Sequence, residues 1–218
     1  MTTPKRHRAP PARRPGRRAQ KKEDVRRRIL EAALTLFQRN GFDETTTKQI
    51  ARRARIAEGT LFNYFPIKDD IALYFLEREV EHAIAAVRGD RRLVKAPLEE
   101  KLFALVQAQI DFLAPYERFI GAAFVSALRP ASTIARGVRA EALRERYLAF
   151  VDELVGESFA PRRRPVLSWF APQAFWIYYL GVLLYWLHDR SRGKQDTLAF
   201  LDRSLKLGVA VLKRASPQ

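Results

Sequence analysis

The sequence of 218 residues contains no cysteine and only three histidines. The absence of cysteine excludes a disulfide framework, a thiolate nucleophile and a thiolate zinc site. His7, His82 and His188 are far apart in the sequence and leave little for histidine-based catalysis or a histidine-rich metal centre. We therefore expect no metal site and no cofactor.

The sequence also lacks a long hydrophobic run. The segment Ala174–Leu187 is 14 residues without a charge, whereas a membrane span needs about 20. Because this segment is apolar all round, we expect a buried helix that touches a core on one side and another apolar surface on the other. No apolar segment closely follows the first basic residues, which excludes a secretory signal, and the proline content argues against a transit peptide. These features predict a cytoplasmic protein with no membrane partner.

Positive charge is plentiful and unevenly distributed. Lysine and arginine total 40 against 24 acidic residues, a net charge of +16, while 47% of residues are hydrophobic, enough for a core. Residues 1–22 carry nine basic residues and no acid, residues 23–70 have a net charge of +1, and residues 71–218 one of +6. Because residues 1–22 lack the apolar side chains that offset ordering entropy, we expect a disordered basic arm. Such an arm binds phosphates or enters a minor groove, or it is a solubilising leader.

Nearly every segment after the arm has helical periodicity, and no convincing strand pattern occurs. The fold class is predicted to be all-α, with an N-terminal three-helix unit over 23–70 and a helical domain over 71–218. We expect helices over about 25–39, 45–53, 58–65, 69–87, 97–113, 116–128, 132–158, 165–188 and 196–213. Residues 89–96 are expected to form a charged linker.

The last helix carries two apolar stripes. One follows the spacing of a helix packed nearly parallel or antiparallel to a partner and consists of Leu198, Leu201, Leu205, Gly208 and Leu212. The other consists of Phe200, Leu207 and Val211. Two interpretations remain open: either one stripe faces the core and the other a second subunit, or both are buried within one chain.

The segment from Gly41 to Lys68, GFDETTTKQIARRARIAEGTLFNYFPIK, has a helix-turn-helix pattern. It closely resembles the DNA-binding domain of the TetR family of transcriptional regulators. The matching features, at the expected spacing, are Gly41–Phe42, the threonines before Ile50–Ala51, Gly59–Thr60–Leu61, Tyr64–Phe65 and Lys68.

The residue types of this motif suit contact with double-stranded DNA. Thr46 is expected to cap the second helix and Thr47 to meet a phosphate, with Lys48 beside it on the outer face. Because Leu61 and Phe65 share the inner face of the third helix, the outer face is left to Gly59, Thr60, Asn63 and Tyr64. Glycine allows close approach, and asparagine can bond adenine bidentately. The resemblance further implies that Tyr64 and Lys68 hold phosphates. The alternative for each residue is simple surface polarity.

Four positions depart from the family pattern. Arg55 stands in place of the usual turn glycine, so the turn must accept a side chain at that conformation or shift. Phe62 lacks a tyrosine hydroxyl that often bonds a phosphate, Ala57 weakens the cap of the third helix, and Ile67 replaces a polar residue. Glu58 suits the helix dipole but repels a nearby phosphate; it can instead accept from a cytosine amine.

The resemblance is looser beyond residue 88. It implies a C-terminal domain that forms a homodimer through the last two helices and holds an effector in an internal pocket. Aromatic side chains are the candidate walls of that pocket, although such residues are also ordinary core, and two glutamines within or beside them need polar partners. The candidates are Gln109, Phe112, Tyr116, Phe119, Phe124, Trp169, Gln173, Phe175, Trp176 and Tyr179.

Together these observations predict a repressor that is not an enzyme, binds a palindromic operator as a homodimer and is released by a small, largely apolar effector. We expect the helix over 68–87 to link the two halves and transmit the effect. One alternative is an enzyme, but no motif gathers catalytic groups, and His82 near Glu79 and Glu81 is interpreted as a solvated helix face. The other is a nonspecific binder of nucleic acid or anionic membranes acting through the arm.

Overall fold

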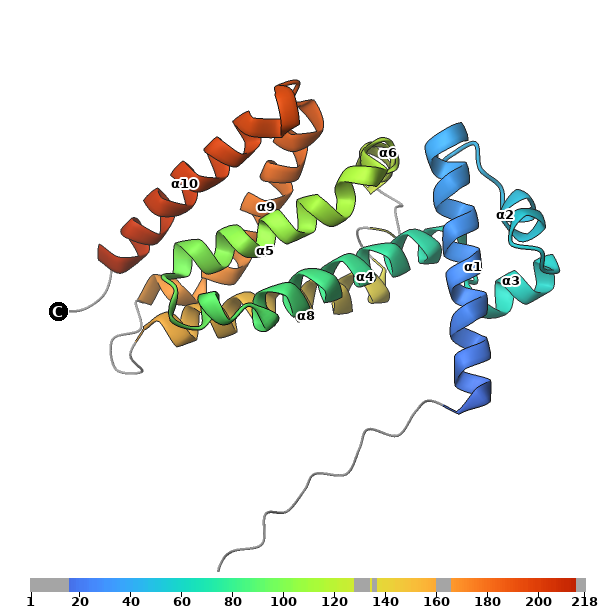
Figure 1. Cartoon of the computed structure of the whole chain (residues 1–218), viewed down its shortest axis with the longest axis horizontal. Helices are drawn as coiled ribbons and strands as arrows, with labels where there is room; N and C mark the ends of the chain where they lie inside the picture. The colour runs from blue at the N-terminus through green and yellow to red at the C-terminus, as the bar shows by residue number, and fades with distance from the viewer. Residues whose placement is uncertain (1–15, 128–133, 135–136, 160–165, 215–218) are drawn as a thin grey trace, which may run out of the picture.

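The computed structural model describes residues 16–127, 134, 137–159 and 166–214, and these residues confirm the all-α class. The N-terminal unit contains α1 (Arg17–Asn40), α2 (Thr47–Arg53) and α3 (Glu58–Tyr64). It lies at one end of an elongated molecule, with α2 and α3 on the far side of α1 from the larger helical domain (Figure 1).

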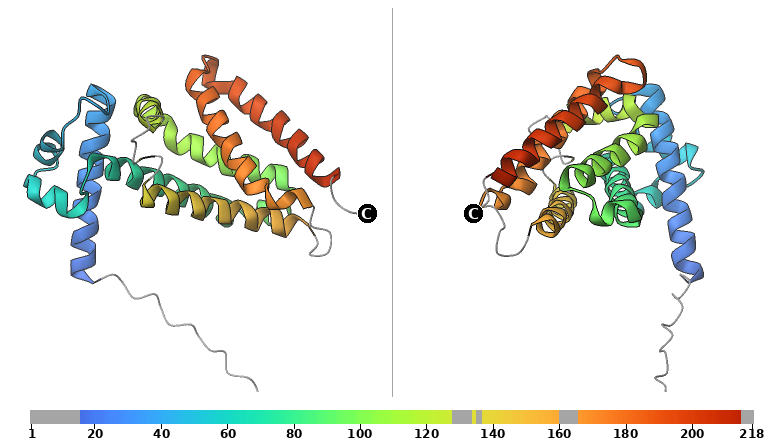
Figure 2. Two further views of the ribbon diagram at one scale, coloured as in Figure 1. Left: turned by 180° about the vertical axis from the view of Figure 1, so that it is seen from behind. Right: turned by 60° about the vertical axis from the view of Figure 1, so that its left-hand side comes forward.

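The larger domain is built from long helices that pack side by side (Figure 2). α4 (Lys68–Gly89) leads from the N-terminal unit into this domain, and the 3-10 turn η1 (Arg91–Lys95) connects it to α5 (Leu98–Leu113). The turn η2 (Ala114–Tyr116), α6 (Glu117–Ala127), α8 (Val138–Ser158), η4 (Val166–Trp169), α9 (Ala171–His188), η5 (Arg192–Lys194) and α10 (Gln195–Arg214) follow. None of the helices in the described ranges combines the length and apolarity that a membrane crossing requires.

Several element boundaries differ from those predicted. The first helix begins at Arg17, so residues 17–22 belong to α1 and not to a disordered arm, while residues 1–15 lie outside the described residues. α9 begins at Ala171 and not near residue 165, because Pro172 is at the start of that helix, where its missing N–H costs nothing. The predicted domain boundary at residue 70 falls inside α4, so this helix is shared by the N-terminal unit and the larger domain.

Two kinds of contact join α4 to the rest of the larger domain. Apolar side chains on one face, among them Leu73, Val80 and Val87, are buried. On another face three ion pairs connect α4 to α8: Glu77–Arg139 at 2.6 Å, Glu81–Arg146 at 2.9 Å and Arg88–Glu153 at 2.6 Å. Because the pairs are partly exposed, each contributes little stability alone, but they fix the register of the two helices.

α9 and α10 form an antiparallel pair on the flank of the domain (Figure 1). Leu201, Leu205 and Val209 of α10 are buried within the chain. The second stripe remains on the surface, with Leu207 68% and Val211 53% exposed. α9 shows the same division, because Ile177 is 71% exposed while Val182 is fully buried. Each of these helices therefore has one apolar side in the core and one apolar side in solvent.

Candidate nucleic-acid interface and internal cavity

The α2–turn–α3 unit is held by local hydrogen bonds. The Thr46 hydroxyl accepts from the Gln49 backbone N–H at 3.2 Å, and the Gln49 side chain accepts from the Thr46 N–H at 2.9 Å. This reciprocal capping box confirms the predicted cap at Thr46. α3 has a weaker start, since its N-cap residue, Ala57, offers no side-chain hydrogen bond.

The turn between the two helices decides between the two alternatives left open at Arg55. Its φ is +55°, a left-handed conformation that a non-glycine side chain adopts at a cost of about 1–2 kcal/mol. The turn therefore accepts the side chain and does not shift to avoid it. The Arg55 side chain is exposed.

Most residues predicted to contact DNA lie on one accessible side of this unit. Lys48, Gly59 and Asn63 are exposed, and Thr60 and Tyr64 are half-buried. Leu61 and Phe65 are buried as predicted, at 0% and 1% exposure. The buried pair orients α3, so its opposite face is presented outward.

Thr47 is less available than predicted. Its hydroxyl donates to the Glu58 carboxylate at 2.9 Å, and this bond ties α2 to the first turn of α3. Glu58 is thus engaged within the motif, and a phosphate could accept from Thr47 only if that hydroxyl turned away from Glu58.

Lys68 holds the protein's own backbone. Its ammonium group donates to the carbonyl oxygens of Phe42, Asp43 and Thr45 at 2.6, 3.2 and 3.1 Å, and lies 4.5 Å from the centre of the Phe42 ring. These three bonds use its three N–H donors. In this structure Lys68 therefore fastens the start of α4 to the loop between α1 and α2, and a phosphate could accept from its ammonium group only if one of these bonds were given up.

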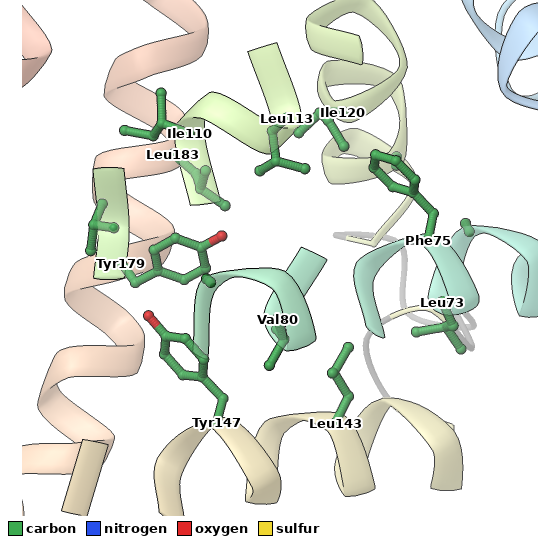
Figure 3. Packing of buried hydrophobic residues seen from close by; sticks show 14 of the residues in the cluster. Leu73, Phe75, Val80, Ile110, Leu113, Ile120, Leu143, Tyr147, Tyr179 and Leu183 are labelled. Atoms are coloured by element: carbon green, nitrogen blue, oxygen red, sulfur yellow. The ribbon is translucent and has the colours of Figure 1, made fainter. Parts of the chain in front are cut away.

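The larger domain contains a partly open cavity of about 520 Å³ between α4, α5, α6, α8 and α9. Its walls are mainly aliphatic and aromatic, including Leu73, Leu113, Ile120, Leu143, Leu183 and Trp176. Figure 3 shows several of these side chains, which reach toward one another from different helices. Polar groups are few: Glu79 lies inside, and Glu141 and Arg144 of α8 are exposed.

The cavity has only some of the predicted walls. Phe124, Trp176 and Tyr179 line it, whereas Trp169 is 72% exposed and Gln173 is also exposed, so these two predictions are corrected. Both lie at the beginning of α9 or before it, outside the part of the helix that faces α4. Phe175 is buried against Tyr147, behind the cavity wall.

Three further predicted walls form a separate aromatic cluster around Phe75 of α4. The ring centres of Phe112, Tyr116 and Phe119 lie 5.4, 5.0 and 5.6 Å from that of Phe75. Phe119 also stacks on Phe37 of α1 at 5.1 Å. These side chains do not line the cavity, and Phe119 joins the larger domain to the N-terminal unit.

Gln109 is fully buried as an acceptor for the Tyr147 hydroxyl, at 2.8 Å, and stands behind the cavity wall. Its amide nitrogen lies near Glu79 and lowers the pKa of that carboxyl, yet no partner among the described residues satisfies it with normal hydrogen-bond geometry. The side-chain oxygen of Gln109 therefore has the expected polar partner, whereas its amide nitrogen has none among the described residues.

Glu79 is the functional candidate that the sequence pattern missed. Its side chain is 2% exposed, not solvated, and it accepts from the Tyr179 hydroxyl at 3.5 Å. Burial raises the pKa of Glu79 from its ordinary 4.5 to about 8, against the opposing effect of hydrogen bonds from Gln109 and Tyr179. The available signal was its spacing: Glu79 falls between Leu76, Val80 and Ala83 on the inner stripe of α4.

The geometry defines a class of protein: a helix-turn-helix unit joined to a helical domain with an internal cavity. Two family models match the chain, one for bacterial regulatory proteins of the tetR family over residues 29–75 and one for the tetracyclin repressor-like C-terminal domain over residues 101–217. The chain belongs to the tetR family. This is a family of regulators and not of enzymes, in agreement with the prediction of a non-catalytic protein.

Among curated relatives, the transcriptional repressor KstR of Rhodococcus jostii is 37% identical over 85 residues, 39% of each chain. The fatty acid metabolism regulator of Bacillus subtilis is 29% identical over 86 residues, 39% of this chain and 44% of the relative. The matched region thus spans less than half the length of these relatives.

Solved structures match over nearly their whole length. The regulator FadR of Thermus thermophilus, in complex with lauroyl-CoA, is 26% identical with a TM-score of 0.60, over 83% of this chain and 92% of that chain. FadR of Bacillus subtilis, in complex with stearoyl-CoA, is 20% identical with a TM-score of 0.63, over 83% and 96%. Because the identity to the Bacillus subtilis structure is only 20%, that match is evidence for a shared fold and not for a shared role.

The two lysines of the motif are expected to respond differently to substitution. Lys48→Ala removes an exposed cation that is expected to meet a base or a phosphate. The magnitude of the slope of log affinity for duplex DNA against log salt concentration should therefore decrease by about 0.9 per chain. Lys68→Met removes backbone hydrogen bonds, so the free energy of unfolding should fall by about 2 kcal/mol with the salt slope unchanged. Fluorescence anisotropy and urea unfolding measure the two quantities. A reduced salt slope in folded Lys68→Met protein would contradict this assignment.

Glu79 predicts a specific dependence of stability on pH. Between pH 4.5 and 8 the unfolded chain has an ionised Glu79 and the folded chain a protonated one, so stability falls as pH rises through this window and levels off above it. The contribution is about 1.4 kcal/mol per pH unit at most. Urea unfolding at several pH values should show this slope in the wild type relative to Glu79→Gln. Parallel curves for the two proteins would contradict the buried, protonated state.

Proposed function

We propose that this protein is a cytoplasmic transcriptional repressor that binds a palindromic DNA operator as a homodimer and is released by a small, largely apolar effector. The observation that carries the proposal is the outward face of α3, held in place by the buried Leu61 and Phe65. The fold and the family matches support it.

The proposed DNA contacts are a subset of those predicted from the sequence. Asn63 and Thr60 are placed to read base edges, and Lys48 and Tyr64 to meet bases or phosphates. Gly59 is exposed, and a Cβ added there would meet no atom of the protein within 4 Å, which leaves room for DNA to approach. Thr47 is retained as a backbone contact that requires its hydroxyl to leave Glu58, and Lys68 is not retained.

The exposed apolar side of α9 and α10 supports a homodimer. Its large side chains are Ile177, Leu184, Tyr185, Phe200, Leu207 and Val211, all between 42% and 71% exposed. Such a continuous apolar face is typical of a subunit interface. A second copy that covers it would form a four-helix bundle, as expected for this family, and would place two α3 helices about one DNA turn (~34 Å) apart.

The cavity supports an effector with an apolar body. Its volume of about 520 Å³ and its mainly aliphatic and aromatic walls are suitable for a small ligand. The two FadR structures hold acyl-CoA ligands, so an alkyl chain is a ligand type that this fold accommodates.

α6 provides a direct route from the cavity to the N-terminal unit. Ile120, Ala123 and Phe124 line the cavity, while the preceding Phe119 stacks on Phe37 and contacts Phe42 at 6.2 Å. A ligand that displaces α6 or α4 would therefore change the orientation of α1–α3, provided that it binds the two arrangements with different affinity.

Selection of bound duplexes from random DNA tests the proposed recognition. We expect a palindrome with half-sites about one helical turn apart. Asn63→Ala should relax the preference at one base pair per half-site by about 1–3 kcal/mol, because it removes a base-edge contact. Gln195→Ala, which removes an exposed amide on α10, serves as the control. No enrichment with the full chain would favour a nonspecific binder instead.

Replacement of an interface residue tests the dimer. Leu207→Glu places a charge in the proposed apolar contact and should convert the dimer to a monomer in analytical ultracentrifugation, with the helical content retained. Val138→Glu, at a residue 87% exposed on α8, should leave the mass unchanged. A wild-type chain that sediments as a monomer, or a Leu207→Glu dimer, would be incompatible with this interface.

A further inference from the structure

The cavity is lined by a carboxyl group that has no countercharge among the described residues. Glu79 lines the cavity beside Trp176 and Tyr179 of α9, and only 2% of it is exposed. A buried carboxylate is costly unless it is paired. No ion pair to Glu79 occurs within the part of the chain that the structure describes.

The described groups around Glu79 offer hydrogen bonds but no positive charge. Tyr179 donates to it at 3.5 Å, and Gln109 of α5 approaches it while accepting from Tyr147 of α8. α6 contributes only apolar side chains to the cavity. His82, one turn further along α4, is exposed and lies against Phe112.

The other charged groups of the cavity neutralise each other. Glu141 and Arg144 of α8 are both exposed and lie 3.8 Å apart. Among the described residues that line the cavity, an anionic ligand group would therefore find a cation only in Arg144, which already has a carboxylate neighbour. Beside Glu79 an anion would face the carboxyl of that residue.

Aromatic rings cluster around Tyr179, whose hydroxyl donates to the Glu79 carboxyl. Trp176 and Tyr179 have ring centres 6.1 Å apart, and Tyr147 lies 5.6 and 5.5 Å from them. The faces of such rings attract cations, with tryptophan the strongest. A carboxyl group and electron-rich rings in one cavity form a site suited to an ammonium group.

We propose that the effector is a lipophilic amine, whose ammonium group binds Glu79 beside Trp176 and Tyr179 and whose apolar part extends toward Leu73 and Ile120. Figure 3 shows Tyr147 and Tyr179 together near Val80, with Leu73 and Ile120 toward the opposite side. This inference rests on the proposed effector-controlled function and specifies the class of its ligand.

Ligand binding would be coupled to proton release. Without ligand, burial raises the pKa of Glu79 to about 8, so the group is protonated at pH 7. An ammonium ion beside it favours the ionised form, and the proton of the carboxyl then passes to the buffer. A neutral ligand of the same shape would release none.

Isothermal titration calorimetry of the full chain at pH 7 tests the proposal with decylamine, decan-1-ol and decanoate as probes. We expect decylamine to bind about tenfold or more tightly than decan-1-ol, and decanoate to bind most weakly. Titrations in two buffers of different ionisation enthalpy should show close to one proton released per decylamine bound. Equal affinities without proton release, tighter binding of decanoate, or no binding by any probe would overturn the assignment.

Two variants make the test specific. Glu79→Gln should abolish the preference for decylamine and the proton release, while its affinity for decan-1-ol stays within about twofold. Glu141→Gln, which removes the exposed carboxylate of the same cavity, should keep both. If Glu79→Gln does not fold, Trp176→Leu replaces it and should lower decylamine affinity by about fivefold relative to decan-1-ol. Retained preference for decylamine in Glu79→Gln or Trp176→Leu, or its loss in Glu141→Gln, would contradict the site.

Failure of this proposal can be told apart from failure of the proposed function. Operator affinity is measured separately with each probe bound. If decan-1-ol or decanoate binds and weakens the operator complex, effector control stands and the amine assignment falls. If decylamine binds as expected and no probe changes operator affinity, the ligand class stands and effector control falls.

Discussion

The stacking of Phe119 on Phe37 is the contact on which the two halves of the molecule depend. It joins α6, a wall of the cavity, to α1, the helix against which α2 packs, with ring centres 5.1 Å apart. Phe42 and Phe75 extend the contact into the loop before α2 and into α4. Aromatic pairs of this kind each contribute about 0.5–1.5 kcal/mol beyond burial, so the cluster is strong enough to move as a unit.

The remaining connections restrict how that unit can move. Lys68 fastens the first turn of α4 to three carbonyl groups of the loop between α1 and α2, so a displacement of α4 is carried into the DNA-binding unit. The ion pairs between α4 and α8 are partly exposed, so each adds little stability while together they keep the register of the two helices.

Much of the DNA-binding unit could be predicted from the sequence because its determinants are local. The Thr46 cap, the strained Arg55 turn and the inward Leu61 and Phe65 depend on neighbours within a few residues. The sequence does not show that Lys68 and Thr47 form hydrogen bonds within the protein. Their partners, the carbonyl groups near Phe42 and the Glu58 carboxylate, are brought to them by the packing of the helices.

The cavity could be predicted only in part, because periodicity shows which side of a helix is apolar but not which neighbour it faces. Phe119 and Phe124 belong to one short helix, yet one packs on α1 and the other lines the cavity. Glu79 was interpreted as solvated because a charged side chain is rarely buried, and only the surrounding helices show otherwise. Such exceptions to local rules are where function is expected.

The central claim, that occupation of the cavity controls DNA binding, is tested most directly by filling the cavity with protein atoms. Ala123→Phe on α6 puts a ring into this space, and Val125→Phe puts the same ring on a side chain that is 60% exposed. Anisotropy titration of the selected operator should give about tenfold weaker binding for folded Ala123→Phe and no change for Val125→Phe. Wild-type operator affinity in both variants would contradict control of DNA binding by occupation of the cavity.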